Sequence, residues 1–437
     1  MKNILQMPPF FVISCSYTEF GKIMILDKYS FGIGDRFSQQ GEAQLKAIQM
    51  ARAEGFEIVP VWNKSNREHQ IIHSTPADTR AEADQAVRSL KWDHPYYVDA
   101  DHINLKTVDP FIPHSDFFTL DVADFIGSEV SAGEVNEFLD LAAPYEGVLH
   151  IPGIGEPFQV DREFLKSVAA QFLGAIREAG AIFQHISARK GHHDFVAEVS
   201  MDEVEVPQTP AELFFILLMI DHFKIPAQTI APKFTGRFNK GIDYVGDVDQ
   251  FRKEFEQDLL VIDHAVRTFQ IPENLKLSVH SGSDKFTIYP VMGELIRKND
   301  KGIHVKTAGT TWLEEVIGLA ISGGSALTMA REIYARAHAR RDELCGPYAT
   351  VIDIDPSTLP DPVEVNGWSG TRFANALRHI PSHAEYHPGF RQLIHVGYKV
   401  AAEMGGAYLD MVRKNREVVA EQVTTNIFER HIKRLFI

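Results

Sequence analysis

Short apolar runs that end in polar or charged residues recur along this 437-residue chain, and each is followed by a stretch with helical periodicity. Short apolar runs of this kind are typical of buried parallel strands. The runs lie at residues 30–37, 57–64, 96–103, 117–124, 195–203, 228–235, 275–285 and 302–310. Eight strand–helix units in series predict an α/β fold, a (β/α)8 TIM-like barrel, rather than an open sheet.

Two of the predicted helices carry clear start signals. Thr75 and Thr209 each stand directly before a proline, which places a capping hydroxyl ahead of Pro at the first helical position. One connection, residues 128–193, is too long for a single helix. It predicts inserted helices and a short hairpin near residues 147–158 within the barrel.

The last part of the chain continues without further strand signals. Residues 312–437 predict a helical C-terminal extension packed on the barrel and covering its mouth, while residues 1–311 form the barrel with its insertion around 128–193. Within the extension, residues 390–405 predict one helix that stops at a glycine pair.

Charge narrows the classes of partner. The net charge is −15, with 44% hydrophobic and 24% charged residues. A nucleic acid or an anionic membrane would favour a basic surface, so neither is expected as a partner. A small anionic substrate remains compatible, because a few local cations outweigh a distant negative field. The oligomeric state is left open.

Cysteine content and the N-terminus favour a reducing compartment. The chain has two cysteines, Cys15 and Cys345, far apart and in no ligand spacing. Pro8-Pro9 interrupts the apolar N-terminal stretch, which disfavours a signal peptide. The longest apolar run, residues 213–220, is far short of the roughly 20 residues that span a bilayer. A cytoplasmic protein is therefore expected.

Ionisable residues stand at nearly every predicted strand end, where barrels of this type place their active sites. Strand alternation predicts that Glu198 and Asp202 point into the barrel, together with Ser278 and His280 on one strand and His304 and Lys306 on the next. Inward groups of mixed sign would be a costly way to build a core, which favours a polar active site over a buried structural network.

Three histidines at strand ends, His102, His280 and His304, are the candidate ligands of a divalent metal cation, with Zn, Ni, Co, Mn or Fe all possible. By alternation His102 faces away from Asp99 and Asp101 unless the strand has already turned. Other histidines remain alternatives, namely His69, His150, His192, His193 and His395. His395 also suits a lid role, because it shares a predicted helix face with Arg391.

A set of cations could hold a substrate carboxylate or phosphate: Lys233, Arg237, Lys285 and Lys306. No glycine-rich loop of the P-loop or dinucleotide-binding type is present. Nicotinamide and ATP are therefore not expected.

At these residues the sequence resembles the tagaturonate epimerase family. The resemblance is carried by stretches that cover most of residues 30–400: GIGDRF (32–37), VDADHI (98–103), SMDE and PQTP (200–210), APKFTGRFNKGIDYVGD (231–247), SVHSGSDKF (278–286), HVKTAGT (304–310) and RQLIH (391–395). It implies an isomerase that interconverts D-tagaturonate and D-fructuronate in hexuronate catabolism with a divalent metal. It also implies a proton acceptor directly before a ligating histidine, which maps to Asp101 and His102.

The implied reaction inverts C4, counting the ketone as C2, a carbon next to neither the ketone nor the carboxylate. Simple enolisation cannot invert this carbon, so retro-aldol cleavage and re-addition is the expected route. Asp101 would take the hydroxyl proton, Asp202 or Glu203 would return one, and the metal would act as Lewis acid. The lysines would bind the substrate carboxylate, Lys306 and Lys233 first, with Lys285 and Arg237 as further candidates.

Two other functions remain open. One is a metal-dependent sugar isomerase or class II aldolase acting on a related sugar acid with the same residues. The other is a non-catalytic sugar-acid-binding protein, which would have no need for acid–base groups beside a metal.

Overall fold

A computed structural model describes residues 24–307 and 310–437. Cys15 and the N-terminal stretch discussed above lie outside the described residues, while Cys345 is a free, partly buried thiol. Eight parallel strands close into a barrel in the order β1-β10-β9-β8-β7-β4-β3-β2. They are β1 (Tyr29–Ile33), β2 (Val59–Ser65), β3 (Tyr97–Ile103), β4 (Phe117–Asp121), β7 (Val196–Ser200), β8 (Ala227–Ala231), β9 (Lys276–His280) and β10 (Ile303–Lys306). The predicted (β/α)8 barrel is confirmed, with each strand inside its predicted run or within one residue of it.

Helices follow the strands and cover the outside of the barrel. They include α1 (Gly41–Ala53), α2 (Asn66–Ile72), α3 (Pro76–Ser89), α6 (Gly174–Lys190), α7 (Pro210–His222), α8 (Val248–Thr268) and α9 (Tyr289–Lys298). Helix α7 begins as predicted, because Thr209 accepts a hydrogen bond from Glu212 N and the Glu212 carboxylate accepts one from Thr209 N. The described part of the chain contains no helix that is both long and apolar enough to cross a membrane.

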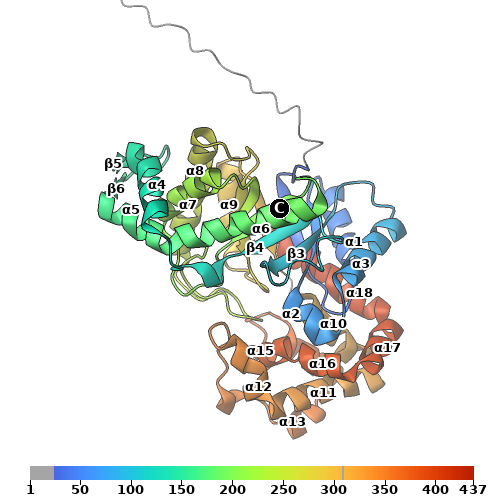
Figure 1. The fold of residues 1–437 in the computed structure, drawn as a ribbon. Coiled ribbons are helices and arrows are strands. Elements are labelled where there is room, and N and C mark those ends of the chain that lie inside the picture. The colour runs from blue at the N-terminus through green and yellow to red at the C-terminus, as the bar shows by residue number, and fades with distance from the viewer. Residues whose placement is uncertain (1–23, 308–309) are drawn as a thin grey trace, which may run out of the picture.

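The long connection between β4 and β7 carries the predicted inserted helices and hairpin. Helices α4 (Ala132–Ala142) and α5 (Arg162–Val168) flank the antiparallel pair β5 (Gly147–Leu149) and β6 (Phe158–Val160). These elements lie together at one side of the barrel (Figure 1).

The C-terminal region is helical, as predicted. Some of its helices pack on the outside of the barrel, and the others form a lobe beside it. The helices of the C-terminal region are α10 (Thr310–Ser322), α11 (Gly324–Ala339), α12 (Arg341–Cys345), α13 (Pro362–Asn366), α14 (Gly370–Leu377), α15 (Pro388–Val396), α16 (Tyr398–Met404), α17 (Gly406–Lys414), α18 (Arg416–Thr425) and α19 (Lys433–Phe436). Helix α18 packs on α1 and α19 packs on α9, so the end of the chain completes the outer layer of the barrel. Helices α11, α12, α13, α15, α16 and α17 gather in a lobe beside it (Figure 1). A division of the chain at residue 311 stays a prediction.

The single helix predicted over residues 390–405 is wrong, because the structure has two helices there. The Gly397 N–H bonds to the carbonyl oxygens of Leu393 and Ile394, which tightens the turn and ends α15. A Cβ at this position would lie 3.1 Å from Ile394 O. The chain then turns into α16, which carries Tyr398 at its start.

The barrel interior changes from apolar to charged along the strands. At the amino ends, Val59, Val61, Tyr97, Phe117 and Val196 belong to a small buried cluster separate from the main core. Two residues further along their strands stand Asn63, Asp99, Thr119 and Glu198, all buried. Side chains alternate between the inside and the outside of the barrel along each strand, as predicted from the sequence. The charged inward-facing side chains therefore lie at the carboxyl ends of the strands, below the mouth of the barrel.

Candidate active site

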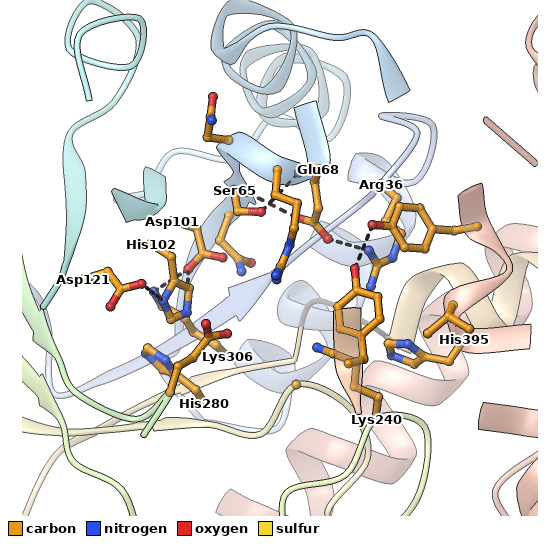
Figure 2. Close-up of a pocket in the computed structure, with 18 of the residues that line it drawn as sticks. Arg36, Ser65, Glu68, Asp101, His102, Asp121, Lys240, His280, Lys306 and His395 are labelled. Atoms are coloured by element: carbon orange, nitrogen blue, oxygen red, sulfur yellow. Dashed lines mark hydrogen bonds and ion pairs between the residues drawn. The ribbon is translucent and has the colours of Figure 1, made fainter. Parts of the chain in front are cut away.

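A cavity of about 290 Å³ opens at the carboxyl ends of the strands. Its walls come from strand ends and the loops after them, and from the C-terminal lobe through Tyr348, His395 and Tyr398. Figure 2 shows Asp101, His102, Asp121, His280 and Lys306 at one end, and Arg36, Lys240 and His395 at the other. The lobe therefore forms part of the cavity wall.

His102 enters the cavity because β3 is irregular at this residue. The pairing of β3 with β4 shifts register between Ala100 and Ile103, and His102 has a φ of 50°. This left-handed conformation is uncommon for a non-glycine residue and is typical of functional sites. It turns the ring to the same side as Asp101. The strand has therefore already turned at His102, which is the condition under which the sequence analysis placed this histidine in the site.

Each of the two site histidines is held by a carboxylate through one ring nitrogen. His280 Nε2 lies 2.8 Å from Glu198 Oε1, and His102 Nδ1 lies 3.3 Å from Asp121 Oδ2. The other nitrogen of His280, Nδ1, is buried without a hydrogen bond, although Asp202 Oδ1 is 3.0 Å away. A carboxylate behind each ring, with the second nitrogen turned to the other side, is the arrangement in which proteins present histidines to a metal.

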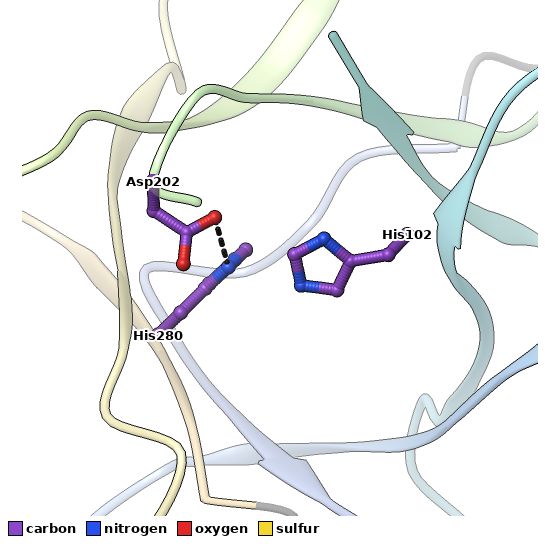
Figure 3. Close-up of side chains that lie close together, drawn as sticks. All are labelled: His102, Asp202 and His280. Atoms are coloured by element: carbon purple, nitrogen blue, oxygen red, sulfur yellow. Dashed lines mark ion pairs between the residues drawn. The ribbon is translucent and has the colours of Figure 1, made fainter. Parts of the chain in front are cut away.

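The donor set fits a divalent transition metal. Ligand atoms of His102, Asp202 and His280 all lie within 4.8 Å of one another (Figure 3), as do those of His102, Asp121 and Glu203. Burial opposes protonation of His280, but Asp202 and Glu198 raise its pKa to about 9, so the site favours a positive charge at this ring. A metal would supply that charge in place of the proton, and mixed imidazole and carboxylate ligands suit Zn, Ni, Co, Mn or Fe.

Lys306 lies in the cavity but is already fully paired. Its Nζ is 2.8 Å from Asp99 Oδ2, 3.0 Å from Asp101 Oδ1 and 2.9 Å from Glu198 Oε1, and it also donates to Thr119. The side chain is 4% exposed. Three carboxylates around one ammonium leave no donor for a substrate anion, so the structure argues against Lys306 as the carboxylate ligand.

The other three predicted cations do not line the cavity. Lys285 is buried and donates to the carbonyl oxygens of Asn239 and Ile242, and burial lowers its pKa to about 7. Arg237 is half exposed and pairs with Asp353 at 3.2 Å. Lys233 lies on the same loop after β8, outside the lining. Lys285 instead fixes this loop, which brings Lys240 to the cavity.

His304 points into the barrel as predicted, but below the cavity. Its Nδ1 is 2.8 Å from Ser30 Oγ, and its ring packs on Phe117. It stands two residues before Lys306 on β10, opposite Ser278 rather than His280. Strand alternation predicts which face of the sheet a residue lies on, but not its position along the barrel axis. The geometry favours Asp202 over His304 as the third ligand.

The sequence interpretation assigned no role to the cations and tyrosines at the far end of the cavity. Arg36 and Lys240 lie inside stretches that carry the family resemblance, so that signal was available for both. Arg67, Tyr348 and Tyr398 lie outside these stretches, and no pattern in the sequence marks them. Of the alternative histidines, His395 lines the cavity, whereas His150 and His192 are exposed.

Comparisons with known proteins identify a family and a fold. A family model described as tagaturonate epimerase matches residues 19–435. A tagaturonate/fructuronate epimerase of Thermotoga maritima is 28% identical over 420 residues, covering 93% of this chain and 80% of the relative. A glycerol-complexed crystal structure of a fructuronate-tagaturonate epimerase from Cohnella laeviribosi superposes with a TM-score of 0.78 at 22% identity, covering 94% of this chain and 82% of that one. The native structure of the same enzyme gives a TM-score of 0.78 at 21% identity, with 94% and 83% covered.

Proposed function

The chain belongs to the tagaturonate epimerase family, and from this premise we propose that it interconverts D-tagaturonate and D-fructuronate by inverting C4. The observation that carries the proposal is the pair His102 and His280, each held by a carboxylate from behind, at a cavity also lined by Asp101 and Glu203. We further place the enzyme in hexuronate catabolism in the cytoplasm, as the sequence predicts.

His102, His280 and Asp202 would hold the divalent metal. When bound, the metal supplies a Lewis acid for the ketone oxygen of the substrate. Glu198 and Asp121 orient the two imidazoles from behind and fix which nitrogen of each faces the cavity.

Asp101 is the proton acceptor of the proposed reaction. Burial favours its neutral form, but Lys306 and the two histidines outweigh burial and lower the pKa of Asp101, so it is ionised at neutral pH. It takes the proton of the C4 hydroxyl, the C3–C4 bond breaks with its electron pair moving toward the ketone, and C4 becomes an aldehyde. The aldehyde fragment turns before the bond forms again on its other face.

The proton that completes the reaction goes to the new C4 alkoxide. Asp202 and Glu203 are the two candidates from the sequence. Asp202 lies against His280 and accepts a hydrogen bond from Ser200. Burial would raise the pKa of Asp202, but the nearby His280 outweighs burial, and the pKa is lowered. Glu203 lines the cavity and pairs with no histidine in the described chain. This arrangement favours Glu203 as the donor and Asp202 as a ligand.

The proposed function is tested by incubating metal-loaded protein with D-tagaturonate and following D-fructuronate by NMR. We expect interconversion from either side to the same equilibrium mixture, and its loss after chelation, with recovery on adding back one of Zn, Ni, Co, Mn or Fe. A protein loaded in turn with each of the five metals that converts neither ketouronate would refute the proposal.

Hydrogen retention tests the cleavage route. Retro-aldol cleavage leaves the hydrogen on C4 in place, so the product formed in heavy water should carry no deuterium at C4 by NMR and mass spectrometry. Transient oxidation at C4 would also retain hydrogen, but it would give a primary isotope effect with substrate deuterated at C4, which cleavage would not. Solvent deuterium at the inverted carbon would exclude the roles given to Asp101 and Glu203.

A further inference from the structure

The far end of the cavity concentrates positive charge on an aromatic platform. Lys240 Nζ lies 5.0 Å from the centre of the Tyr348 ring, and the Arg67 guanidinium lies 5.3 Å from it. The Tyr348 and Tyr398 hydroxyl groups are 3.3 Å apart and join the two rings into one surface. Cation–π contacts of this kind hold cationic side chains in place without neutralising them.

Neither Arg67 nor Lys240 forms an ion pair with a carboxylate within the described chain, although Glu203 in the same lining attracts both from a greater distance, whereas Arg36 beside them is paired. Arg36 pairs with Glu68 at 2.7 Å and stacks on Tyr398 at 4.0 Å. Burial lowers the pKa of Lys240 and outweighs the opposing attraction of Tyr348 and Glu203, while the nearby Arg36 adds to the lowering. A partly desolvated cation without a partner is unfavourable, and an anionic ligand would relieve it.

His395 provides an independent sign of a polar ligand at the same end. It is 1% exposed, it lines the cavity, and neither ring nitrogen has a hydrogen-bond partner. Burial, together with Arg36 and Lys240, holds its pKa well below the usual range, so the ring is neutral and offers one donor and one acceptor. A buried polar side chain left unpaired is unfavourable, and a hydrogen bond to a hydroxyl-bearing ligand would relieve this.

We propose that Arg67 and Lys240 bind the carboxylate of the ketouronate substrate, and that His395 binds a hydroxyl group next to it. The assignment rests on the proposed function, which supplies a sugar acid as substrate. It orients the molecule along the cavity, with the carboxylate at Lys240 and the ketone toward His102 and His280. These side chains lie at opposite ends of the cavity (Figure 2). It replaces Lys306, Lys233, Lys285 and Arg237, which the sequence suggested for this role.

The orientation explains why carbon–carbon cleavage can occur in one cavity without loss of a fragment. Cleavage at C3–C4 leaves the carboxylate on the aldehyde fragment, which carries C4 to C6. Arg67 and Lys240 would hold this fragment by its charged end while C4 turns its other face to C3. The ketone fragment is held at the opposite end of the cavity. The subsite therefore serves both affinity and retention of the intermediate.

Substitution of Lys240 or Arg67 by methionine tests the assignment. For Lys240→Met we expect the KM of D-tagaturonate to rise about 10- to 100-fold with kcat changed by less than about threefold, as for one charge-assisted contact. Arg67→Met, on the exposed side of α2, should act in the same direction, and Lys240→Arg should recover most of the loss. The matched control is Lys253→Met on α8, an exposed lysine outside the cavity lining, which should leave KM unchanged.

Calorimetric titration of chelator-treated protein with D-tagaturonate separates this inference from the proposed function. Binding to the wild type that weakens in Lys240→Met supports the subsite even if no metal restores turnover, in which case only the proposed function fails. Turnover by the wild type with an unchanged KM in both Lys240→Met and Arg67→Met overturns the subsite and leaves the function standing. Absence of both binding and turnover in the wild type overturns both.

Discussion

Replacement of His280 by alanine should release the divalent metal and lower kcat/KM by about 10³-fold or more, because the Lewis acid stabilises the transition state by several kcal/mol. His280 presents a buried nitrogen without a hydrogen bond to the cavity, and its other nitrogen is held by Glu198. His102→Ala should have a similar effect, since its ring faces the same point. Both variants should fold, because the apolar layer of the barrel lies below them. Elemental analysis after dialysis measures the metal, and the ketouronate assay measures the activity.

The variant His304→Gln discriminates between the two candidate ligand sets. The ligand set suggested by the sequence and the set favoured by the structure share His102 and His280 and differ in the third member, His304 or Asp202. His304 is tied to Ser30, so His304→Gln should keep its metal, whereas Asp202→Asn should weaken metal binding. Loss of metal in His304→Gln with full occupancy in Asp202→Asn would reverse this choice.

How much of the fold could be predicted depends on what the alternation of apolar and polar residues determines. Period-two spacing identified the eight strands and the inward face of Glu198, His280 and Lys306, because one wrong step would bury charge against the helices. It could not give the height of His304 in the barrel, since height depends on the shear between neighbouring strands. For His102 it gave the opposite face unless the strand had already turned, and the ring does reach the cavity through the irregular end of β3.

Alternation predicts which side chains point inward only where a single strand carries the information. The pairing of Lys306 with Asp99, Asp101 and Glu198 joins three strands and depends on their register around the closed barrel. The platform made by Tyr348 and Tyr398 depends on how the C-terminal lobe packs beside the barrel mouth. The sequence pattern of a helix in the lobe does not indicate which of its residues line a cavity. These tyrosines could therefore not be predicted from the pattern.

Substitution of Lys306 by methionine should cost about 3–5 kcal/mol in the free energy of unfolding, because it removes the one ammonium group that pairs with all three buried carboxylates. Burial already raises the pKa of Asp99 to about 7 with Lys306 present, and Lys306 opposes that rise. The variant should also lose kcat, since Asp101 loses the partner that holds it ionised and in place. If Lys306 instead bound the substrate carboxylate, the loss would fall on KM for uronates and would spare neutral ketohexoses.

Two further variants separate the stability loss from the catalytic loss. Lys276 is also buried inside the barrel, but at the amino end, where it donates to the carbonyl oxygens of Leu26 and Asp27. Lys276→Met should therefore lower the thermal midpoint while kcat stays unchanged. The double variant Lys306→Met/Asp99→Asn removes one of the unpaired carboxylates and should recover part of the stability without recovering kcat. If Lys306→Met kept the wild-type midpoint and kcat and raised only KM, Lys306 would be a substrate ligand, and the three-carboxylate cluster would have no catalytic role.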